Sequence, residues 1–369
     1  MIGMSTTEHA SPRVKRPELS PEEREAKRAA REAARAKAIE EAPFVAVVVR
    51  ASGIHPSSSR IVAIDAVTFS DNGTVVDKFF AVVNTDSDPG PKHLHGLTPE
   101  DIAQGKKMEQ LVRALDRFID GRTLVVHNAP RTWGFLVSET RRALKRQRGR
   151  ARSQNRNHRR QGPRRRLGHV PRPARIVDTL ASLRRRGVAL QDTRLRAVAH
   201  LMGCGPDNAA ASISRAQQDP AEVVREETLL LVNLFLTLRG GELAVRQPDQ
   251  LRADRFGLQR SIVRAEASDC PPEFTNPGVY IPGKPLVEGM ELVVTPEITM
   301  DPNIIIEAAV DANLAYSEKL TRTTSIVICN STEQLRGKAM HAQRKGIPLV
   351  RDAEFLELVK TVAKGTPTT

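Results

Sequence analysis

The order of strand and helix patterns is the feature that most constrains the fold of this chain. Three strand patterns rich in β-branched and aromatic residues come first, over residues 44–49, 60–69 and 74–83. An Asn-Gly turn between the last two predicts an antiparallel hairpin. An amphipathic helix is then expected over residues 97–121, with Thr98 as its N-cap. It leads to a fourth strand at 122–129, which a helical crossover makes parallel to its neighbour.

The remaining patterns predict a mixed α/β sheet with helices on both faces, followed by a small parallel α/β sheet. Near the start, Ser20 and Glu23 form a capping-box pattern ahead of a charged, solvent-exposed helix. Beyond residue 242 the sequence becomes irregular and rich in Pro and Gly. The chain therefore divides into a disordered leader with a charged helix (1–41), an α/β domain (42–242), a linker (243–285), a second domain (286–362) and a tail (363–369).

A single segment makes the chain basic. The formal net charge is +14, and residues 141–175 contain fifteen Lys or Arg and no Asp or Glu. Because it has almost no aliphatic residues, the part from about 145 to 173 is expected to be a mobile insertion that binds nucleic acid. No Phe, Tyr or Trp is interspersed, which favours contact with phosphates over stacking on bases. The alternative is a solvated loop without a ligand. The predicted nucleic-acid-binding residues are Arg146, Arg148, Arg150, Arg152, Arg156, Arg159, Arg160, Arg164, Arg165 and Arg166.

Five stretches resemble, in order and spacing, the 3′–5′ exonuclease domain of the DNA polymerase III epsilon (proofreading) subunit, of the DEDD or ribonuclease H-like superfamily. They are FVAVVVRASG, RIVAIDAVTF, HLHGLTPEDIAQG, LVVHNAPRTWGFL and RIVDTLASL, and the resemblance covers roughly residues 42–240. It implies a five-stranded mixed sheet of the ribonuclease H-like kind. Residues 286–362 resemble a BRCT domain, chiefly through ELVVTPE, SIVICN and GKAMHAQRKGIPLV. That second resemblance implies docking onto a protein partner.

In the exonuclease family, carboxylates on three elements hold two metal ions that hydrolyse a phosphodiester bond. Carried over to this chain, the Asp-x-Glu pair of the first strand falls on Val48 and Arg50, and the middle Asp falls on Thr132. The late His falls on Glu222 and the last Asp on Glu227. A cation in place of an acid repels Mg²⁺ or Mn²⁺, and one carboxylate does not hold two hard ions. We therefore predict no intact catalytic site, no metal and no cofactor.

The alternative is an active 3′–5′ exonuclease that hydrolyses phosphodiesters with Mg²⁺ or Mn²⁺ held by displaced carboxylates, such as Glu222, Glu227 and Asp178. Against it, Asp65 lies in the second strand, where the fold ordinarily has a small residue, and Asp178 fits a structural turn. His127 is a candidate base by type, and we expect it to make structural hydrogen bonds instead.

The BRCT resemblance also implies a candidate phosphate site. In the members that bind phosphopeptides, a Ser or Thr after the first strand, the next backbone N–H and a Lys on a later helix hold the phosphate. Thr295 and Lys338 match two of these positions, and Pro296 has no N–H to donate at the third. We therefore favour docking of a protein or a DNA end over phosphate binding for this segment.

Our leading hypothesis is a catalytically degenerate, epsilon-like protein that binds nucleic acid, with DNA favoured over RNA, and docks a partner in DNA replication or repair. A second alternative to it is an RNA- or ribosome-associated binding protein. The longest apolar run, at 42–49, is too short to span a bilayer, so no membrane partner is expected. Three widely spaced cysteines predict neither zinc nor disulfides. We expect a cytoplasmic protein, with nucleoid association as a further option.

Overall fold

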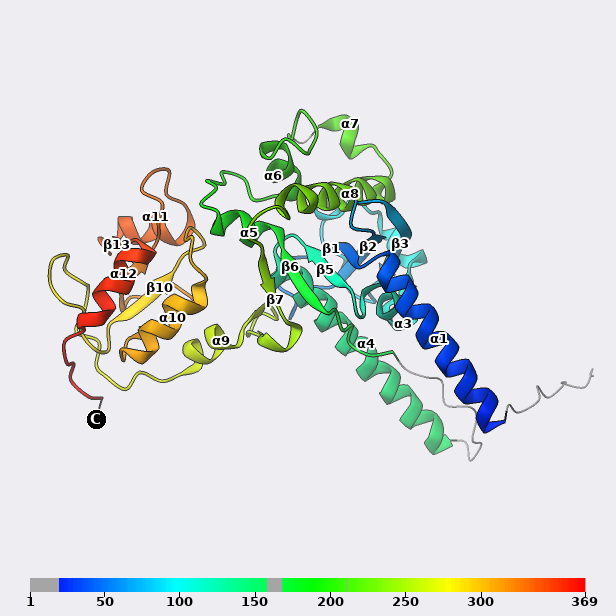
Figure 1. Ribbon diagram of the computed structural model, residues 1–369, viewed down its shortest axis with the longest axis horizontal. Coiled ribbons are helices and arrows are strands. Elements are labelled where there is room, and N and C mark those ends of the chain that lie inside the picture. The colour runs from blue at the N-terminus through cyan, green and yellow to red at the C-terminus, as the bar shows by residue number, and fades with distance from the viewer. Residues whose placement is uncertain (1–19, 158–167, 211, 369) are drawn as a thin grey trace, which may run out of the picture. The chain divides into compact units, whose positions relative to one another are not determined.

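The computed structural model describes residues 20–157, 168–210 and 212–368, without the side chains of 150–157, 213 and 216 (Figure 1). The chain forms two compact units, residues 1–41 and residues 42–369. In the first unit, α1 (Pro21–Glu41) has no buried residue. The Ser20 N–H donates to Glu23 Oε2 at 2.7 Å and the Glu23 N–H donates to Ser20 Oγ at 3.1 Å. The predicted capping box and exposed helix are therefore both confirmed.

A seven-stranded mixed sheet forms the centre of the larger unit, in the order β4-β3-β2-β1-β5-β6-β7. The strands are β1 (Phe44–Ala51), β2 (Ile61–Phe69), β3 (Val75–Asn84), β4 (Lys106–Lys107), β5 (Thr123–Val126), β6 (Arg175–Asp178) and β7 (Ala244–Arg246). The pairs β1–β2, β2–β3 and β6–β7 are antiparallel, whereas β1–β5, β5–β6 and β3–β4 are parallel. The predicted mixed α/β sheet is confirmed, and the short edge strands β4 and β7 extend its five expected strands to seven.

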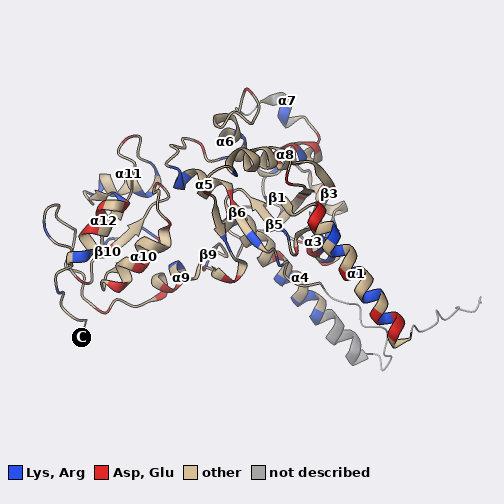
Figure 2. Cartoon of the chain, in the orientation of Figure 1, with Lys and Arg blue, Asp and Glu red and all other residues tan. Residues whose placement is uncertain are grey.

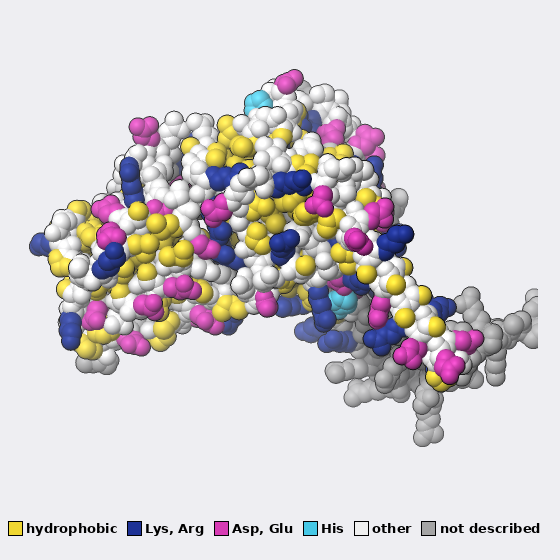
Figure 3. Space-filling model, viewed as in Figure 1, with side chains coloured by type: hydrophobic (Ala, Val, Ile, Leu, Met, Phe, Trp, Pro, Cys, Tyr) yellow, Lys and Arg dark blue, Asp and Glu magenta, His cyan; other side chains and the backbone are white. Residues whose placement is uncertain are grey.

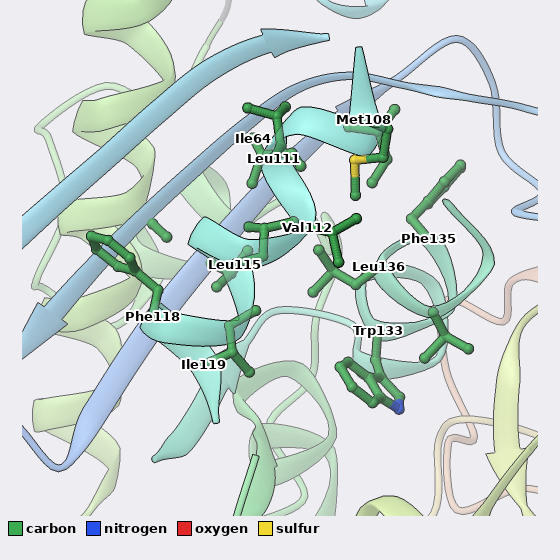
Figure 4. Close-up of a cluster of buried hydrophobic side chains, with 14 of the residues drawn as sticks. Ile64, Met108, Leu111, Val112, Leu115, Phe118, Ile119, Trp133, Phe135 and Leu136 are labelled. Atoms are coloured by element: carbon green, nitrogen blue, oxygen red, sulfur yellow. The ribbon is translucent and has the colours of Figure 1, made fainter. Parts of the chain in front are cut away.

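Helices cover both faces of this sheet, and the alternation of side chains along β1 explains how (Figure 1). The helices are α2 (Pro99–Gln104), α3 (Met108–Ile119), α4 (Ala129–Asn157), α5 (Thr179–Arg185), α6 (Leu195–Leu201), α7 (Ile213–Ala216) and α8 (Pro220–Leu238). Val45 and Val47 point to one face, where they join the core formed with α3 and α4. Figure 4 shows Leu115 of α3 and Leu136 of α4 in this core. Ala46 points to the other face and joins the core formed with α8. Continuing this alternation, Val48 and Arg50 also face α8.

The predicted helix over 97–121 is interrupted, which corrects the sequence-based expectation. Thr98 does cap α2, since it accepts the Asp101 N–H at 3.2 Å. The helix ends at Gly105, whose ψ of 160° is extended. A Cβ at this glycine would lie 2.8 Å from the carbonyl oxygen of Val82, so the close approach of β3 requires glycine here. The two residues that follow pair with β3 as β4 before α3 begins.

The expected linker over 243–285 is also more ordered than its composition indicates. It contains β7, a two-stranded antiparallel sheet and a helix, namely β8 (Leu251–Ala253), β9 (Gln259–Ser261) and α9 (Ile262–Asp269), with a 3-10 turn at Pro248–Gln250. Asp301 is the N-cap of the helix that begins at Pro302. Its carboxylate forms an ion pair at 2.8 Å with Arg185 of α5, and Arg246 of β7 binds the same carboxylate. The domain boundaries themselves stay a prediction.

A four-stranded parallel sheet follows, in the order β11-β10-β12-β13, as predicted for the C-terminal segment. Its elements are β10 (Glu291–Val294), α10 (Pro302–Asp311), β11 (Ala315–Tyr316), β12 (Thr324–Ile328), α11 (Gly337–Arg344), β13 (Leu349–Val350), α12 (Asp352–Leu358) and the 3-10 turn Val359–Thr361. Its own apolar core is centred on Leu292, Ile306 and Phe355, all fully buried. Among the described helices, none is long and apolar enough to cross a membrane.

Glu318 in this segment supplies a first testable prediction. Its carboxylate binds the guanidinium of Arg264 of α9. Burial alone would raise the pKa of Glu318, but the charge and hydrogen bonds of Arg264 outweigh burial and lower the pKa to about 2. We expect Glu318→Gln to lower the free energy of unfolding at pH 7 by about 3 kcal/mol, because it leaves the mostly buried Arg264 without its partner. The stabilising effect is complete above the unfolded-state pKa near 4.5 and is lost as the pH falls toward 2.

Urea denaturation at several pH values measures this effect. Glu357→Gln is the matched control, because Glu357 also binds a cation, Lys360, at 2.7 Å but is exposed, where ion pairs contribute little. Equal losses in the two variants at pH 7, or a Glu318→Gln loss that does not shrink on acidification, would contradict the prediction.

Candidate functional site

A cavity of about 480 Å³ lies at the carboxyl ends of β1 and β5. In open α/β sheets this edge is where ligands bind, because the loops that follow the parallel strands diverge there. Its wall is formed by the end of β1, the first turn of α4 and the start of α6, together with one residue each of α7 and α8, Arg215 and Glu227. We call this cavity the β1–α8 cleft.

Arg50 and Glu227 form an ion pair inside the β1–α8 cleft. Arg50 is the last residue but one of β1 and faces α8, where Glu227 lies one turn before the buried Leu231. Arg50 Nη2 lies 2.7 Å from Glu227 Oε1, and Arg215 Nη2 lies 3.4 Å from the same oxygen. The Glu227 side chain is 16% exposed, so the pair is shielded from bulk water. Two guanidinium groups thus neutralise the carboxylate that lines the cleft.

Four of the five positions carried over from the exonuclease pattern meet in the cleft. Val48, Arg50, Thr132 and Glu227 all line it. Val48 offers no ligand atom, and the Thr132 hydroxyl donates a hydrogen bond to the backbone carbonyl of His127 at 3.2 Å. Glu222 lies in the first turn of α8, is exposed and does not line the cleft. The described part of the cleft wall therefore brings one carboxylate to this point.

The nearby carboxylates that could replace the missing ones have other partners. Asp178 accepts hydrogen bonds from four backbone N–H groups, two at the start of α5 and two at the start of α4, at 2.8 to 3.2 Å. Asp65, which is fully buried on β2 and paired in register with Val48, has Arg225 Nη2 at 2.6 Å. Burial raises the Asp65 pKa, and the positive charge of Arg225 opposes that rise. The partners of Asp178 and Asp65 are therefore backbone and side-chain groups of the protein itself, and both acids have a structural role.

His127 makes structural hydrogen bonds, as predicted. Its Nε2 lies 2.8 Å from the carbonyl oxygen of Thr193, which can only accept, so Nε2 carries the proton. Its Nδ1 accepts from the Thr179 hydroxyl at 2.8 Å. Burial lowers the pKa of the ring, which keeps it neutral. With both nitrogens engaged, the ring has no site left to act as a base.

Sequence reasoning missed most of the basic character of the cleft. Its lining includes five arginines, namely Arg50, Arg131, Arg194, Arg196 and Arg215. Burial, together with the nearby charge of Arg50, lowers the pKa of Arg131. Arg131 directly precedes the expected acid position Thr132, but no pattern in the sequence indicates that α4, α6 and α7 bring their arginines to one cavity.

The described residues contain one cluster of His and acidic side chains with metal-ligand spacing, and it lies elsewhere. Asp116 and Asp120 at the end of α3 face His169. His169 Nε2 is 2.7 Å from Asp120 and Nδ1 is 3.4 Å from Asp116, so the imidazole bridges the two acids. Asp120 precedes β5, which places this cluster at the amino ends of the parallel strands, opposite the cleft.

The predicted nucleic-acid-binding arginines fall in three groups. Arg146 and Arg148 lie on α4, where Arg146 Nε is 2.8 Å from Glu109 Oε1 and Arg148 is exposed. Figure 2 shows the blue basic segments along this helix. Arg150, Arg152 and Arg156 belong to the α4 backbone, so this part of the expected mobile insertion is helical. The remaining residues, Arg159, Arg160, Arg164, Arg165 and Arg166, lie outside the described residues. Elsewhere, acidic and basic side chains intermix on the face shown in Figure 3.

Thr295 and Lys338 meet at the carboxyl end of β10. Thr295 is 2% exposed, and its hydroxyl accepts the Glu297 N–H at 3.3 Å. Lys338 of α11 donates to the carbonyl oxygen of Val294 at 3.3 Å. Burial, followed by the charge of Arg264, lowers the Lys338 pKa to about 8. The two side chains thus lie beside one another, with the threonine turned into the core.

No protein-family model and no curated protein matches this sequence. Among solved structures, E. coli exonuclease I in complex with a dT13 oligonucleotide is 15% identical, with a TM-score of 0.35 over 53% of this chain and 41% of that one. A moderately thermophilic exonuclease I from Methylocaldum szegediense is 18% identical, with a TM-score of 0.24 over 28% of this chain and 23% of that one. The chain spans less than half the length of these exonucleases. The fold itself is a mixed α/β sheet with helices on both faces, as the sequence predicted.

Proposed function

We propose that this chain is a non-catalytic, epsilon-like exonuclease-fold protein that binds nucleic acid. The observation that carries the proposal is the ion pair between Arg50 and Glu227 in the β1–α8 cleft. Two-metal hydrolysis needs several carboxylates converging on one point. Among the described residues that line the cleft there is one carboxylate, and two guanidinium groups already bind it. Mg²⁺ or Mn²⁺ entering the cleft would meet these fixed cations, which repel it at short range.

Metal binding and strand trimming test the catalytic part of this proposal. We expect calorimetric titration of the full chain with Mn²⁺ to give no heat of binding assignable to the cleft, and a labelled single-stranded DNA to stay intact in Mn²⁺ or Mg²⁺. Glu227→Ala is the control, because it removes the carboxylate that lines the cleft. Trimming that persists in this variant reports a contaminant. Trimming by the unaltered chain that this variant abolishes would contradict the proposal and favour an active exonuclease.

The basic segment is the proposed nucleic-acid contact, through phosphates and without base reading. We expect replacement of six arginines by glutamine to reduce the slope of log affinity against log salt concentration for a long single strand. The reduction should be about 4, because each lost phosphate contact lowers the slope by about 0.7. The six are Arg150, Arg152, Arg156, Arg159, Arg160 and Arg164. Fluorescence anisotropy at several salt concentrations measures the slope.

The charged helix α1 supplies a matched control. It also carries six basic residues, all exposed, at Arg24, Lys27, Arg28, Arg31, Arg35 and Lys37. Neutralising these six changes the net charge by the same amount. Equal slopes for the two variants would mean that only overall charge matters, and would refute a specific role for the basic segment. DNA and RNA probes of the same sequence separate the DNA-directed proposal from the ribosome-associated alternative.

For the C-terminal segment we propose a BRCT-like docking role near DNA replication or repair. Its four-stranded parallel sheet flanked by helices supports this reading. The buried Thr295 hydroxyl and the missing N–H at Pro296 weigh against phosphopeptide capture. A phosphopeptide array probed with the full chain should therefore give no binding that Lys338→Ala abolishes, and such binding would reverse this assignment.

A further inference from the structure

We propose that the β1–α8 cleft binds a phosphate group of a single-stranded nucleic acid through its guanidinium groups, with no metal ion. The proposal deepens the proposed function, since it takes nucleic acid as the ligand and names the group that is held. In this arrangement fixed cations of the protein stand where metal ions would otherwise contact the phosphate.

The charge inside the cleft is the first argument. Of the five lining arginines, three have acidic partners: Arg50 binds Glu227, Arg215 binds Glu226 and Glu227, and Arg194 binds Asp192. The other two, Arg131 and Arg196, have no carboxylate partner among the described residues. Arg131 donates to the carbonyl of Gly53 at 3.3 Å and Arg196 to that of Asn208 at 3.1 Å. The cleft therefore holds excess positive charge.

That excess charge favours an anion. Like charges enclosed in a cavity repel one another more strongly than in bulk water, and an anion placed between them relieves the repulsion. Guanidinium groups bind phosphate through two parallel N–H···O bonds, a geometry that a lysine ammonium does not offer. Arg131 on α4 and Arg196 on α6 line the same cavity from different elements, so each offers a guanidinium to an anion held there.

The shape and composition of the cleft select the kind of ligand. Its volume of about 480 Å³ is in the range of pockets that bind small ligands and excludes a double helix. Among its described lining residues there is no Phe, Tyr or Trp on which a base could stack. These features fit one phosphate of a flexible single strand, held without preference for the base.

A short oligonucleotide tests the proposal on the full chain. The probe is a 3′-phosphorylated hexathymidylate, titrated by calorimetry in EDTA so that divalent metals are absent. We expect Arg131→Gln/Arg196→Gln to weaken binding about 100-fold, or roughly tenfold for each charged hydrogen-bonding group lost. The slope of log affinity against log salt should fall by about 1.4, for two phosphate contacts.

The matched control is Arg239→Gln/Arg252→Gln, which removes two cations whose nearest acidic oxygens are at 4.0 and 3.9 Å and which do not line the cleft. Its affinity should stay within about twofold of the unaltered chain. Equal weakening in both double variants, or none in either, overturns the proposal. Should the Arg131 substitution unfold the protein, Arg196→Gln alone must still weaken binding about tenfold, since Arg196 only holds a surface carbonyl.

Two further arms identify the source of the phosphate. Inorganic phosphate and thymidine 3′-monophosphate are titrated separately, and both should bind more weakly than the hexamer. If inorganic phosphate binds as tightly as the hexamer, the nucleic-acid assignment of the cleft is wrong. Failure here is distinguishable from failure of the proposed function, because metal binding, trimming and the basic segment are read by separate assays. Binding that requires Mn²⁺ would instead overturn both.

Discussion

Arg225→Ala is expected to lower the free energy of unfolding by about 3 to 5 kcal/mol at pH 7, the usual cost of removing one partner of a buried ion pair. Asp65 is fully buried on β2, and Arg225 Nη2 lies 2.6 Å from its carboxylate. Without Arg225, Asp65 loses the guanidinium beside it and must either stay charged in the core or take up a proton. Urea denaturation of the full chain measures the loss.

The pH dependence of the loss has a definite sign. Burial raises the pKa of Asp65 in the folded protein above its ordinary value of 3.8, and Arg225 opposes this rise. An acid with a raised folded-state pKa destabilises the fold at high pH, and this penalty is relieved as the pH falls through the folded-state pKa toward 3.8. In Arg225→Ala the folded-state pKa rises further. The difference from the unaltered chain should therefore be largest at neutral pH and shrink on acidification.

Two variants make this prediction falsifiable. Asp65→Asn/Arg225→Met removes both charges and should recover most of the lost stability, because apolar or neutral replacements of a buried pair are often neutral. Arg239→Ala removes an exposed arginine near the other end of the same helix and should change stability little. A loss in Arg225→Ala that is as small as in Arg239→Ala, or that grows at low pH, would contradict the buried-charge account.

The sequence predicted elements better than their interruptions. Continuous β-branched runs placed β1, β2 and β3 within one or two residues, because a buried strand leaves a strong local signal. The break at Gly105 was missed because it depends on the approach of a carbonyl from β3, which is a contact distant in sequence. The strands β7 to β9 were missed for a related reason. At three residues each, they are too short to carry a periodic pattern.

In the candidate site, too, the features with a local sequence signal were predicted and those that depend on distant contacts were not. That Arg50 faces α8 follows from strand alternation, and its meeting with Glu227 agrees with the expectation that both mark one site. The role of Arg225 could not be predicted, since nothing local shows that it binds Asp65 of β2. Likewise, Arg131 and Arg196 reach the cleft from helices far apart in the sequence. On the α8 face of the sheet, arginines form ion pairs with the carboxylates: Arg50 with Glu227, and Arg225 with Asp65.

If arginine substitution removed a metal site, restoring the acids should restore metal binding. We expect Val48→Asp/Arg50→Glu/Thr132→Asp to bind Mn²⁺ with a dissociation constant of about 10⁻⁴ to 10⁻³ M, the range of weak oxygen-ligand sites, where the unaltered chain binds none in the cleft. All three positions line the cleft with Glu227, which the change frees from Arg50. Calorimetry with Mn²⁺ at low salt measures the gain.

The same triple variant carrying Glu227→Gln is the decisive control, since it removes one charged ligand group and adds no bulk. It should bind Mn²⁺ at least about tenfold more weakly, as expected when a charged ligand group is lost. Arg50→Glu alone should bind no better than this control, because two carboxylates hold a hard cation poorly. Arg131 and Arg215 remain in the cleft and weaken any site there, so adding Arg131→Gln to the triple variant should tighten Mn²⁺ binding further. Equal Mn²⁺ affinity in the triple variant and in its Glu227→Gln control would place the metal outside the cleft, and arginines would then not have replaced a metal site here.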